Sequence, residues 1–228
     1  MTSNIQLRCN KLVNRTGKSV ASHNFSLSVI FPLNQTGDSM KRCEVSQLIA
    51  RDRGTEEAKK YSSYVLEDLE LLGRTGREVL SDVPPRSGDC AMLSALWASG
   101  LNEYYSMPAM VVAGDLKING RKAFNCKKNI PTSNDSMRTI KEKWDGHCWI
   151  EVGGYIGDLS IFRTAYSLGE NSNLKNFILS EFGEGRGILV SNKEGLPNGM
   201  EYVPKYVLND QRIAGLLRGL ELQMENRV

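Results

Sequence analysis

Alternation of apolar and polar residues marks several short segments of this chain as half-buried β-strands. Residues 5–9 and 25–29 alternate in this way, so we expect a small β element in this part of the chain. Residues 109–113 are continuously apolar, as in a strand that is buried on both faces. The dipeptide Asn119-Gly120 after that run favours a tight hairpin turn, and the pattern predicts that the main sheet begins here.

A second hairpin is predicted around the pair Gly153-Gly154. Residues 147–152 precede the pair and residues 155–159 follow it, and both segments have the composition of strands. A two-residue turn sets the residues on either side of it opposite each other, so every further pair along the two strands follows in step. The expected register therefore predicts which side chains of the two strands lie on the same face of the sheet.

Longer segments show the three-to-four-residue spacing of amphipathic helices. From Thr55 the apolar positions recur in this way, and we expect one helix that ends at Gly73. A turn-rich stretch then leads to a second predicted helix, which begins at Cys90 and stops near Gly100. Asn209 can cap a final helix, which would bury four apolar side chains: Ile213, Leu216, Leu217 and Leu220.

The order of these elements predicts an α+β fold, with helices in the first half and mostly antiparallel strands in the second. The chain has 228 residues, of which 40% are hydrophobic, and this is enough for one large domain with its own core. We expect residues 1–80 to form a small N-terminal β/α extension, either separate from the domain or integral to it. Residues 81–228 are expected to form the catalytic core.

Charge and cysteine content narrow the class of protein. Lys and Arg together exceed Asp and Glu by only three, which is too little to predict nucleic-acid binding. We see neither an export signal nor an apolar run that could span a membrane, so we expect a cytoplasmic protein without a membrane partner. Five widely spaced cysteines make a poor disulfide framework, and we expect free thiols.

Cys90 is the first candidate for chemistry, because it stands at the start of a predicted helix. A helix N-terminus lowers the pKa of a thiol, and the thiolate is the form that attacks a carbonyl carbon. The side chain of Ser87 or Asp89 can cap the helix, and the backbone N–H of Cys90 can be one donor of an oxyanion hole. The alternative is that Cys90 is a small core residue, since free cysteines are often fully buried.

His147 and Asp158 favour the catalytic interpretation of Cys90. In the register of the predicted hairpin, side chains of His147, Trp149, Asp158 and Ser160 share one face. His147 then lies diagonal to Asp158, within reach of a hydrogen bond. Asp158 would orient the imidazole, while His147 would accept the thiol proton and later protonate the leaving amine. The sequence therefore predicts a Cys-His-Asp triad.

Other residues compete for roles at this site. The second histidine of the chain, His23, falls in a predicted loop of the N-terminal part. Asp145 and Glu151 are rival acids: Asp145 precedes the strand, and Glu151 shares the face of His147 but equally suits an ordinary polar strand position. Trp149 also shares that face, so we expect it to contact the substrate, with burial in the core as the alternative.

Three segments of the chain, residues 87–96, 147–152 and 157–160, resemble the motifs of the transglutaminase-like superfamily of cysteine enzymes. Members place the nucleophile at a helix start, a His-x-Trp motif on one strand and an aspartate on the next. The resemblance covers about residues 84–164 and implies a papain-like core topology, with the nucleophile helix packed on the sheet. Cys148 departs from the pattern, because a small residue commonly follows the histidine. A calcium-binding loop motif is not found, so calcium control is not implied.

The triad and the resemblance together predict a thiol hydrolase that cleaves an amide of a protein or peptide through a thioester intermediate. Water as the acceptor gives a protease or a glutamine deamidase, and an amine gives a transglutaminase-type acyltransferase. Hydrolysis is favoured because it is the most widespread chemistry among the enzymes that this chain resembles. The alternatives from other classes are a non-catalytic peptide-binding module of the same fold and a basic interaction factor with a coincidental triad.

The segment 117–143 contains eight basic and two acidic residues. It joins the cysteine and histidine parts of the chain, so we expect it to border the cleft and to favour acidic substrates, with a solvated loop as the alternative. We expect no metal, because Cys126, His147 and Cys148 lack the spacing of a zinc site. We expect no nucleotide cofactor either, because a phosphate-binding glycine-rich loop is not found.

Overall fold

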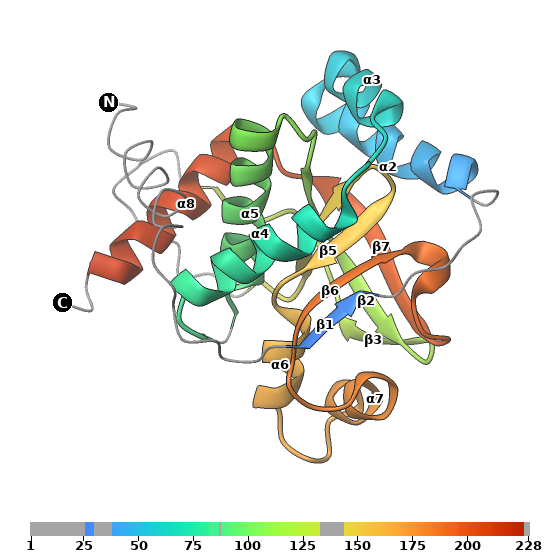
Figure 1. The fold of residues 1–228 in the computed structure, drawn as a ribbon, viewed down its shortest axis with the longest axis vertical. Coiled ribbons are helices and arrows are strands. Elements are labelled where there is room, and N and C mark those ends of the chain that lie inside the picture. Colours follow the sequence, from blue (N-terminus) through green and yellow to red (C-terminus); the bar gives the residue numbers. More distant parts are fainter. Residues whose placement is uncertain (1–25, 30–37, 87, 133–143, 226–228) are drawn as a thin grey trace.

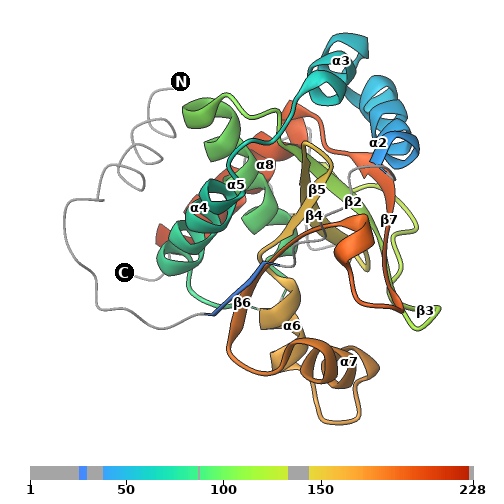
Figure 2. The same ribbon diagram turned by 45° about the vertical axis from the view of Figure 1, so that its right-hand side comes forward.

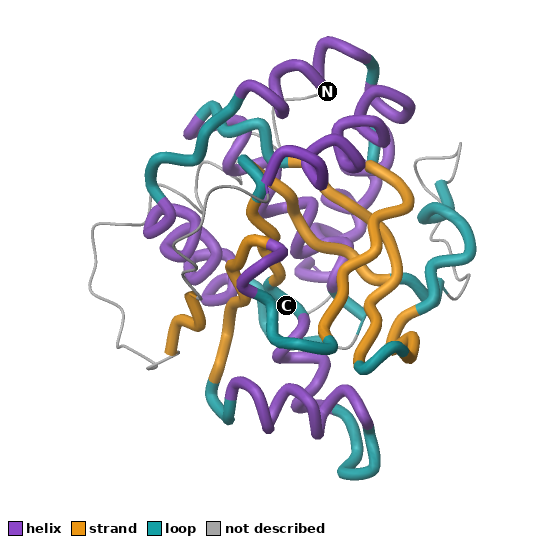
Figure 3. Tube along the Cα trace, turned by 90° about the vertical axis from the view of Figure 1, so that its right-hand side faces the viewer, coloured by secondary structure: helices purple, strands orange, loops and turns teal. Residues whose placement is uncertain are grey.

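The structure is a computed structural model with an α+β fold, built around one mostly antiparallel sheet (Figure 1). Its helices lie on both sides of the sheet, and Figure 3 shows the strands from the side as one twisted surface. The described residues are 26–29, 38–86, 88–132 and 144–225. The predicted strand at 5–9 and the residues Ser87 and His23 lie outside these ranges.

The sheet has the strand order β1-β6-β5-β4-β2-β3, and β7 pairs with β2. The pairing of β1 with β6 is parallel, and the other pairings are antiparallel. The strands are β1 (Ser26–Val29), β2 (Met110–Ile118), β3 (Arg121–Phe124), β4 (His147–Val152), β5 (Tyr155–Asp158), β6 (Arg186–Asn192) and β7 (Met200–Val207).

Strand β2 organises the sheet, because it is long enough to hold three partners. β7 runs along one edge of β2, while β4 and then β3 share the other edge. On that shared edge Phe124, at the end of β3, is opposite Leu116, and His147, at the start of β4, is opposite Gly114. The end of β3 and the beginning of β4 therefore meet at one point of the sheet.

Both predicted hairpins are confirmed. Asn119 and Gly120 join β2 to β3 with φ angles of 49° and 74°, and Gly153 and Gly154 join β4 to β5 with φ angles of 56° and 88°. Two successive residues with positive φ are the mark of the type I′ turn, whose twist matches that of paired strands. Strand β4 pairs with β5 in the register that this turn imposes, with Val152 opposite its neighbour across the turn.

Seven α-helices of the described ranges cover the two faces of the sheet: α2 (Asp38–Arg53), α3 (Thr55–Ser63), α4 (Leu69–Asp82), α5 (Cys90–Tyr105), α6 (Ile161–Ser167), α7 (Asn173–Phe182) and α8 (Asp210–Glu225). Side chains of α4, α5 and α8 form one hydrophobic cluster with the sheet. Side chains of α2, α3, α6 and α7 form a second cluster on the opposite face. Figure 2 shows α4, α5 and α8 together and α6 with α7 apart from them.

Helix α5 lies very close to the sheet because glycine is present where the two meet. A Cβ atom at Gly157 of β5 would lie 2.6 Å from the ring of Trp97, which is buried on α5. The indole N–H of Trp97 donates a hydrogen bond of 2.9 Å to Thr75 on α4. These contacts hold the middle of α5 against β5 and α4, and we expect a side chain at position 157 to push the helix away from the sheet.

The prediction of one helix from Thr55 to Gly73 was wrong. The structure has two helices here, because the backbone becomes extended at Tyr64 and the Asp68 carboxylate accepts a hydrogen bond from the Leu71 N–H to start α4. Val65 lies in the connection and is 65% exposed, although the apolar pattern placed it on the buried face. A local side-chain cap thus outweighed the periodicity.

The helix that begins at Cys90 passes the predicted end at Gly100 and continues to Tyr105, where Ser106 adopts a left-handed conformation. Asn209 caps the final helix as predicted, since its side chain accepts a hydrogen bond of 3.1 Å from the Arg212 N–H. Of the four apolar residues expected inside this helix, Leu220 is buried and the other three are partly buried.

The N-terminal elements share their packing with the rest of the chain. Val45 and Ile49 of α2 and Tyr61 of α3 belong to the hydrophobic cluster that also contains Val112 of β2 and Trp149 of β4. Strand β1 adds to the edge of the same sheet. Among the helices of the described ranges, not one combines the length and the apolar character that crossing a membrane requires.

Candidate active site

Cys90 is the first residue of α5, a helix that is apolar along most of its length and buried against the sheet. The first N–H groups of a helix have no partner within it, so the start of α5 offers backbone donors beside the thiol. Asp89 occupies the N-cap position, but its side chain makes no capping hydrogen bond, contrary to what we expected for this residue. Ser87, the other predicted cap, lies outside the described residues, so capping by Ser87 stays a prediction.

Cys90 and His147 line the same cleft, which has a volume of about 710 Å³. The cleft lies where β3 ends and β4 begins. One wall comes from β3 and the residues just before β4, and the other comes from α6 and the start of α7. The remaining lining residues are Gly88, Ile118, Arg121, Lys122, Ala123, Phe124, Asn125, Trp144, Asp145, Gly146, Thr164, Leu168, Ser172, Asn173 and Leu174.

The imidazole of His147 is buried and held on several sides. Its Nε2 atom lies 2.6 Å from Oδ2 of Asp158. The ring stacks on Phe124 with 4.7 Å between centroids, and Tyr202 packs against it with 6.1 Å between centroids. The close pairing of β3 and β4 along one edge of β2 thus delivers both the histidine and the ring that supports it.

The carboxylate of Asp158 is fully buried and accepts hydrogen bonds on both oxygens. Oδ1 accepts from the N–H and the hydroxyl of Ser160, at 2.8 and 2.9 Å, and from the N–H of Ile161 at 3.0 Å. Oδ2 accepts from the Tyr202 hydroxyl at 2.8 Å, in addition to its contact with His147. Burial by itself would raise the pKa of Asp158, but the charge of His147 and these hydrogen bonds lower it overall.

His147 is disposed to carry a proton. Burial would lower its pKa, but the charge and hydrogen bond of Asp158, together with the Cys90 sulfur, raise the pKa to about 10. Its second ring nitrogen, Nδ1, has no hydrogen-bond partner of normal geometry within the described residues. Because Nε2 is bound to Asp158, Nδ1 is the ring nitrogen left for the Cys90 sulfur. The distance between these two atoms is long, or their alignment is poor, for a hydrogen bond. Catalytic hydrogen bonds of this kind often tighten only when substrate binds.

Cys90 has the character of a thiolate. A hydrogen bond with the thiol of Cys148 lowers its pKa most, burial opposes this, and the hydrogen bond and charge of His147 lower it further, so the pKa lies well below the ordinary value. Cys126, which is also buried, has its pKa raised to about 11 by burial. These shifts favour the thiolate form of Cys90 and the imidazolium form of His147, with the carboxylate of Asp158 behind them.

Two contributors to the site were missed by sequence reasoning. Tyr202 comes from β7, far along the chain, and no local pattern connected it with Asp158. Cys148 was considered as a departure from a family motif and as a possible zinc ligand, but not as a partner of Cys90. Its thiol reaches Cys90 because β4 directs it toward α5, on the face opposite to that of His147.

The structure corrects the prediction that Trp149 contacts the substrate. Its side chain is fully buried, does not line the cleft and packs edge-on against Tyr202, with 5.0 Å between centroids. Its indole N–H donates to the Glu151 carboxylate at 3.2 Å. Of the two rival acids, Glu151 is thus bound inside the core and Asp145 lines the cleft, while Asp158 is the acid that contacts His147.

The basic segment contributes to the cleft, as expected for its described part. Arg121 and Lys122 of β3 both line it. Lys122 forms an ion pair of 2.9 Å with the buried carboxylate of Asp115, which also pairs with Lys205 at 2.8 Å. Arg121 is exposed. Lys122 is exposed as well but is held by Asp115, so the guanidinium of Arg121 is the better candidate at this wall for contact with a ligand.

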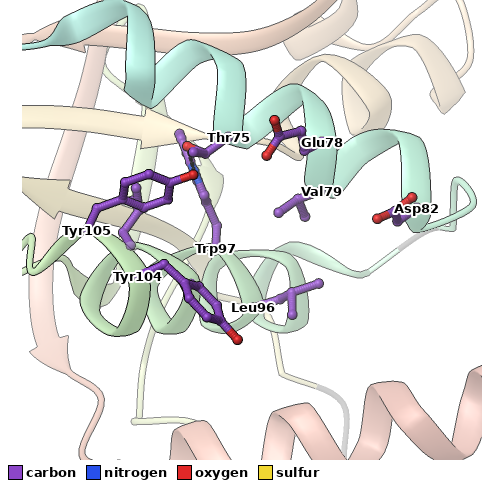
Figure 4. A pocket seen from close by; sticks show the side chains of 10 residues that line it. Thr75, Glu78, Val79, Asp82, Leu96, Trp97, Tyr104 and Tyr105 are labelled. Carbon is purple, nitrogen blue, oxygen red and sulfur yellow. Dashed lines mark hydrogen bonds between the residues drawn. The ribbon is translucent and has the colours of Figure 1, made fainter. Parts of the chain in front are cut away.

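A second hollow lies between α4 and α5, far from the histidine. Figure 4 shows Thr75, Glu78 and Val79 of α4 facing Trp97 and Tyr105 of α5 across it. Its volume is only about 60 Å³, and most of its surface is apolar. This hollow contains none of the residues of the predicted triad, so the cleft at Cys90 is the candidate active site.

Comparison of the chain with protein-family models, with curated proteins and with solved structures finds no significant match. Function must therefore be argued from the chemistry of the site itself. Within the described residues, His, Cys, Asp and Glu side chains do not gather in a group of three or more that could hold a metal ion.

Proposed function

We propose that this chain is a cysteine-dependent amide hydrolase of the transglutaminase-like superfamily, with a papain-like core and a triad of Cys90, His147 and Asp158. One observation carries the proposal: the imidazole is bound to a buried carboxylate through Nε2 and has Nδ1 left for a thiol at the wall of a cleft. A cysteine and a histidine that served only the core would have no reason to line a cleft together.

The geometry supports a two-step reaction. The Cys90 thiolate attacks the carbonyl carbon of the amide, and the backbone N–H at the start of α5 stabilises the oxyanion. His147 donates its proton to the leaving amine, which departs and leaves a thioester on Cys90. His147 then takes a proton from water, the resulting hydroxide attacks the thioester, and the acid product leaves as the thiolate is restored. Asp158 keeps the ring oriented throughout.

The cleft supports a protein or peptide as the substrate. Its volume of about 710 Å³ is within the range of binding pockets. Arg121 lies exposed on one wall, so an acidic side chain next to the scissile amide would gain a favourable contact. The thiols of Cys90, Cys126 and Cys148 are free, which suits a reducing compartment such as the cytoplasm.

Alkylation of Cys90 tests the activated pair directly. We expect iodoacetamide to label Cys90 rapidly below about pH 7, and we expect the His147→Ala variant to label more slowly there, because the thiolate loses the hydrogen bond and the charge of the imidazole. Mass spectrometry measures the labelling of each cysteine separately. Cys126 is the internal control, since burial raises its pKa to about 11. Equal rates for Cys90 and Cys126 would reject the proposal and favour a peptide-binding module.

The products formed from a glutamine-containing acidic peptide distinguish the three reactions. New amino termini indicate a protease, ammonia release without cleavage indicates a deamidase, and incorporation of an added fluorescent primary amine indicates an acyltransferase. We expect hydrolysis. The Cys90→Ala variant is the control in each assay, and a product that persists in this variant would come from a contaminant or from another site.

A further inference from the structure

Cys148 is a buried thiol that the proposed reaction does not need. It follows His147 on β4, is completely buried, and belongs to the hydrophobic cluster against which Cys90 packs, so each thiol shifts the pKa of the other. The two cysteines are held on different rigid elements, the first turn of α5 and a central strand of the sheet. Their contact is therefore a fixed feature of the fold rather than an encounter between loops.

The two thiols differ in access and in protonation. Cys90 lines the cleft and is half-buried, so a small solute can reach its sulfur. Its pKa is lowered, mainly by the hydrogen bond with Cys148. Cys148 has no exposed surface, and burial followed by the neighbouring Cys90 sulfur raises its pKa well above the ordinary value. An accessible thiolate backed by a protonated thiol is the arrangement found at reversibly oxidised cysteines.

We propose that Cys90 and Cys148 are a redox modification site, at which hydrogen peroxide converts the two thiols into a disulfide that blocks the nucleophile. The Cys90 thiolate attacks one peroxide oxygen, the S–O bond forms, the O–O bond breaks, and hydroxide leaves to become water. The Cys148 sulfur then attacks Cys90 and loses its proton, and the S–O bond breaks as a second water forms. Two thiols are oxidised by two electrons, and one peroxide is reduced to two waters.

The geometry favours this disulfide over further oxidation of Cys90. Because Cys90 at the start of α5 and Cys148 on β4 belong to one hydrophobic cluster, where the helix packs on the sheet, the bond can form without bringing distant elements together. A sulfenic acid on Cys90 has a thiol directly behind it, so the sulfur is captured before a second peroxide can enter the cleft. The modification requires only that Cys90 be reactive toward peroxide, and it is independent of which acyl transfer the site performs.

Cys126 is the matched control, because it is a third buried thiol close enough to influence Cys148 electrostatically. Its thiol is directed to the Lys128 carbonyl oxygen at 3.4 Å. It does not line the cleft, and its pKa is raised to about 11. The inference therefore predicts a bond of Cys148 with Cys90 and not with Cys126.

A peptide map of the oxidised full-length chain tests the inference. Trypsin places the three cysteines on separate peptides, 87–117, 123–127 and 144–163. After brief exposure to hydrogen peroxide and blocking of free thiols, we expect peptide 87–117 linked to 144–163, together with loss of iodoacetamide labelling at Cys90. Dithiothreitol should restore that labelling.

Two variants complete the test. Cys148→Ser should give no linked peptide and should drive Cys90 to sulfinic acid, which dithiothreitol does not reverse, whereas Cys126→Ser should behave as the wild type. Thermal unfolding of each variant checks its fold, and the wild-type map stands even if a variant is unstable. Sulfinic acid on wild-type Cys90 with Cys148 still free, or a link through Cys126, would overturn the inference.

Discussion

The two nitrogens of His147 contact two regions of very different character. On the Nε2 side lies the acid region, which consists of Asp158, Ser160 and Tyr202 and is completely enclosed, with both carboxylate oxygens hydrogen-bonded. On the Nδ1 side lies the thiol region, which consists of Cys90, Cys148 and the adjoining cleft and contains a ring nitrogen without a well-aligned partner. The enclosed acid region thus fixes the orientation of the imidazole, and the thiol region leaves Nδ1 available for reaction.

The largest expected effect comes from removing the acid region's carboxylate. Asp158→Ala would leave the Tyr202 hydroxyl, the Ser160 N–H and the His147 ring without their partner inside the core. Breaking a buried charged pair in this way destabilises a protein by about 3–5 kcal/mol. We expect a loss of this size in the free energy of unfolding, measured by urea denaturation followed by circular dichroism.

Asp158→Asn is the matched variant, because the amide retains the shape of the side chain. We expect it to unfold closer to the wild type and yet to lose most of the rapid labelling of Cys90, since the imidazole is no longer paired with a negative charge. If the asparagine variant labelled as fast as the wild type, the acid region would have a purely structural role.

The pH dependence of stability separates the two members of the thiol–imidazole pair. The pKa of His147 is raised in the fold, so its contribution is full below its ordinary value of 6.5 and is lost as the pH rises through about 10. The pKa of Cys90 is lowered, so its contribution is full above the ordinary value of 9.0 and is lost as the pH falls. Together they predict that the pair stabilises the fold most between pH 6.5 and pH 9.0.

The comparison of the wild type with a double variant, Cys90→Ser with His147→Gln, measures this contribution. We expect the difference in unfolding free energy to be on the order of a few kcal/mol at its maximum, because each unit of pKa shift corresponds to about 1.4 kcal/mol. The difference should decline toward pH 10 and toward pH 5. A difference that stays constant across this range would show that the pair is not ionised in the fold.

A smaller effect is expected from Tyr202→Phe, which removes one hydrogen bond to Oδ2 of Asp158 and retains the ring. The cost should be about 1–2 kcal/mol, as for other hydrogen bonds to charged groups. Iodoacetamide labelling of Cys90 should require a higher pH in this variant, because the charged form of Asp158, and with it the ion pair to the imidazolium, loses a stabilising hydrogen bond.

Tyr166→Phe is the control for that variant. Tyr166 donates a hydrogen bond of 2.9 Å to the Gly183 carbonyl and accepts one of 3.2 Å from the Arg186 N–H, away from the imidazole. We expect a similar loss of stability but no change in the labelling of Cys90. A shift in labelling by both tyrosine variants would point to a general loosening of the fold.

The smallest effect concerns the outer wall of the cleft. Arg121→Ala should raise the KM for a peptide with an acidic residue beside the scissile amide by a few-fold, since exposed ion pairs contribute less than about 1 kcal/mol. The kcat should remain unchanged, and a neutral peptide should show no difference. Lys117→Ala is the control, because Lys117 pairs with Glu201 and does not line the cleft.

Sequence alone was sufficient for the parts of this site that local rules determine. The turn at Gly153-Gly154 fixed the register of β4 with β5, and alternation then placed His147 on the same face as Asp158. The rules state which face a side chain occupies but not what covers that face. Trp149 was therefore expected in a groove, whereas Tyr202 and the helices of that layer enclose it.

The failure to predict the interaction of Cys148 with Cys90 has the same origin. The contact of Cys148 with Cys90 depends on which face of the sheet α5 covers, and this follows from the whole fold. The break between α3 and α4 is different, because an aspartate at position 68 can be recognised from sequence as a helix cap, but the prediction relied on the apolar spacing alone. The resemblance to the transglutaminase-like superfamily remains a proposal that the labelling experiment tests.

The shared edge of β2 has a consequence for how such proteins can diverge. The chain leaves the sheet at Phe124 and returns to the same edge at His147, so the ladder of β2 does not limit the length of the segment between them. Insertions, deletions or exchanges in that segment can alter the rim of the cleft while the triad residues keep their places. A lineage could therefore acquire new substrates and inherit its chemistry unchanged, and grafting this segment between homologues would be a practical way to transfer specificity.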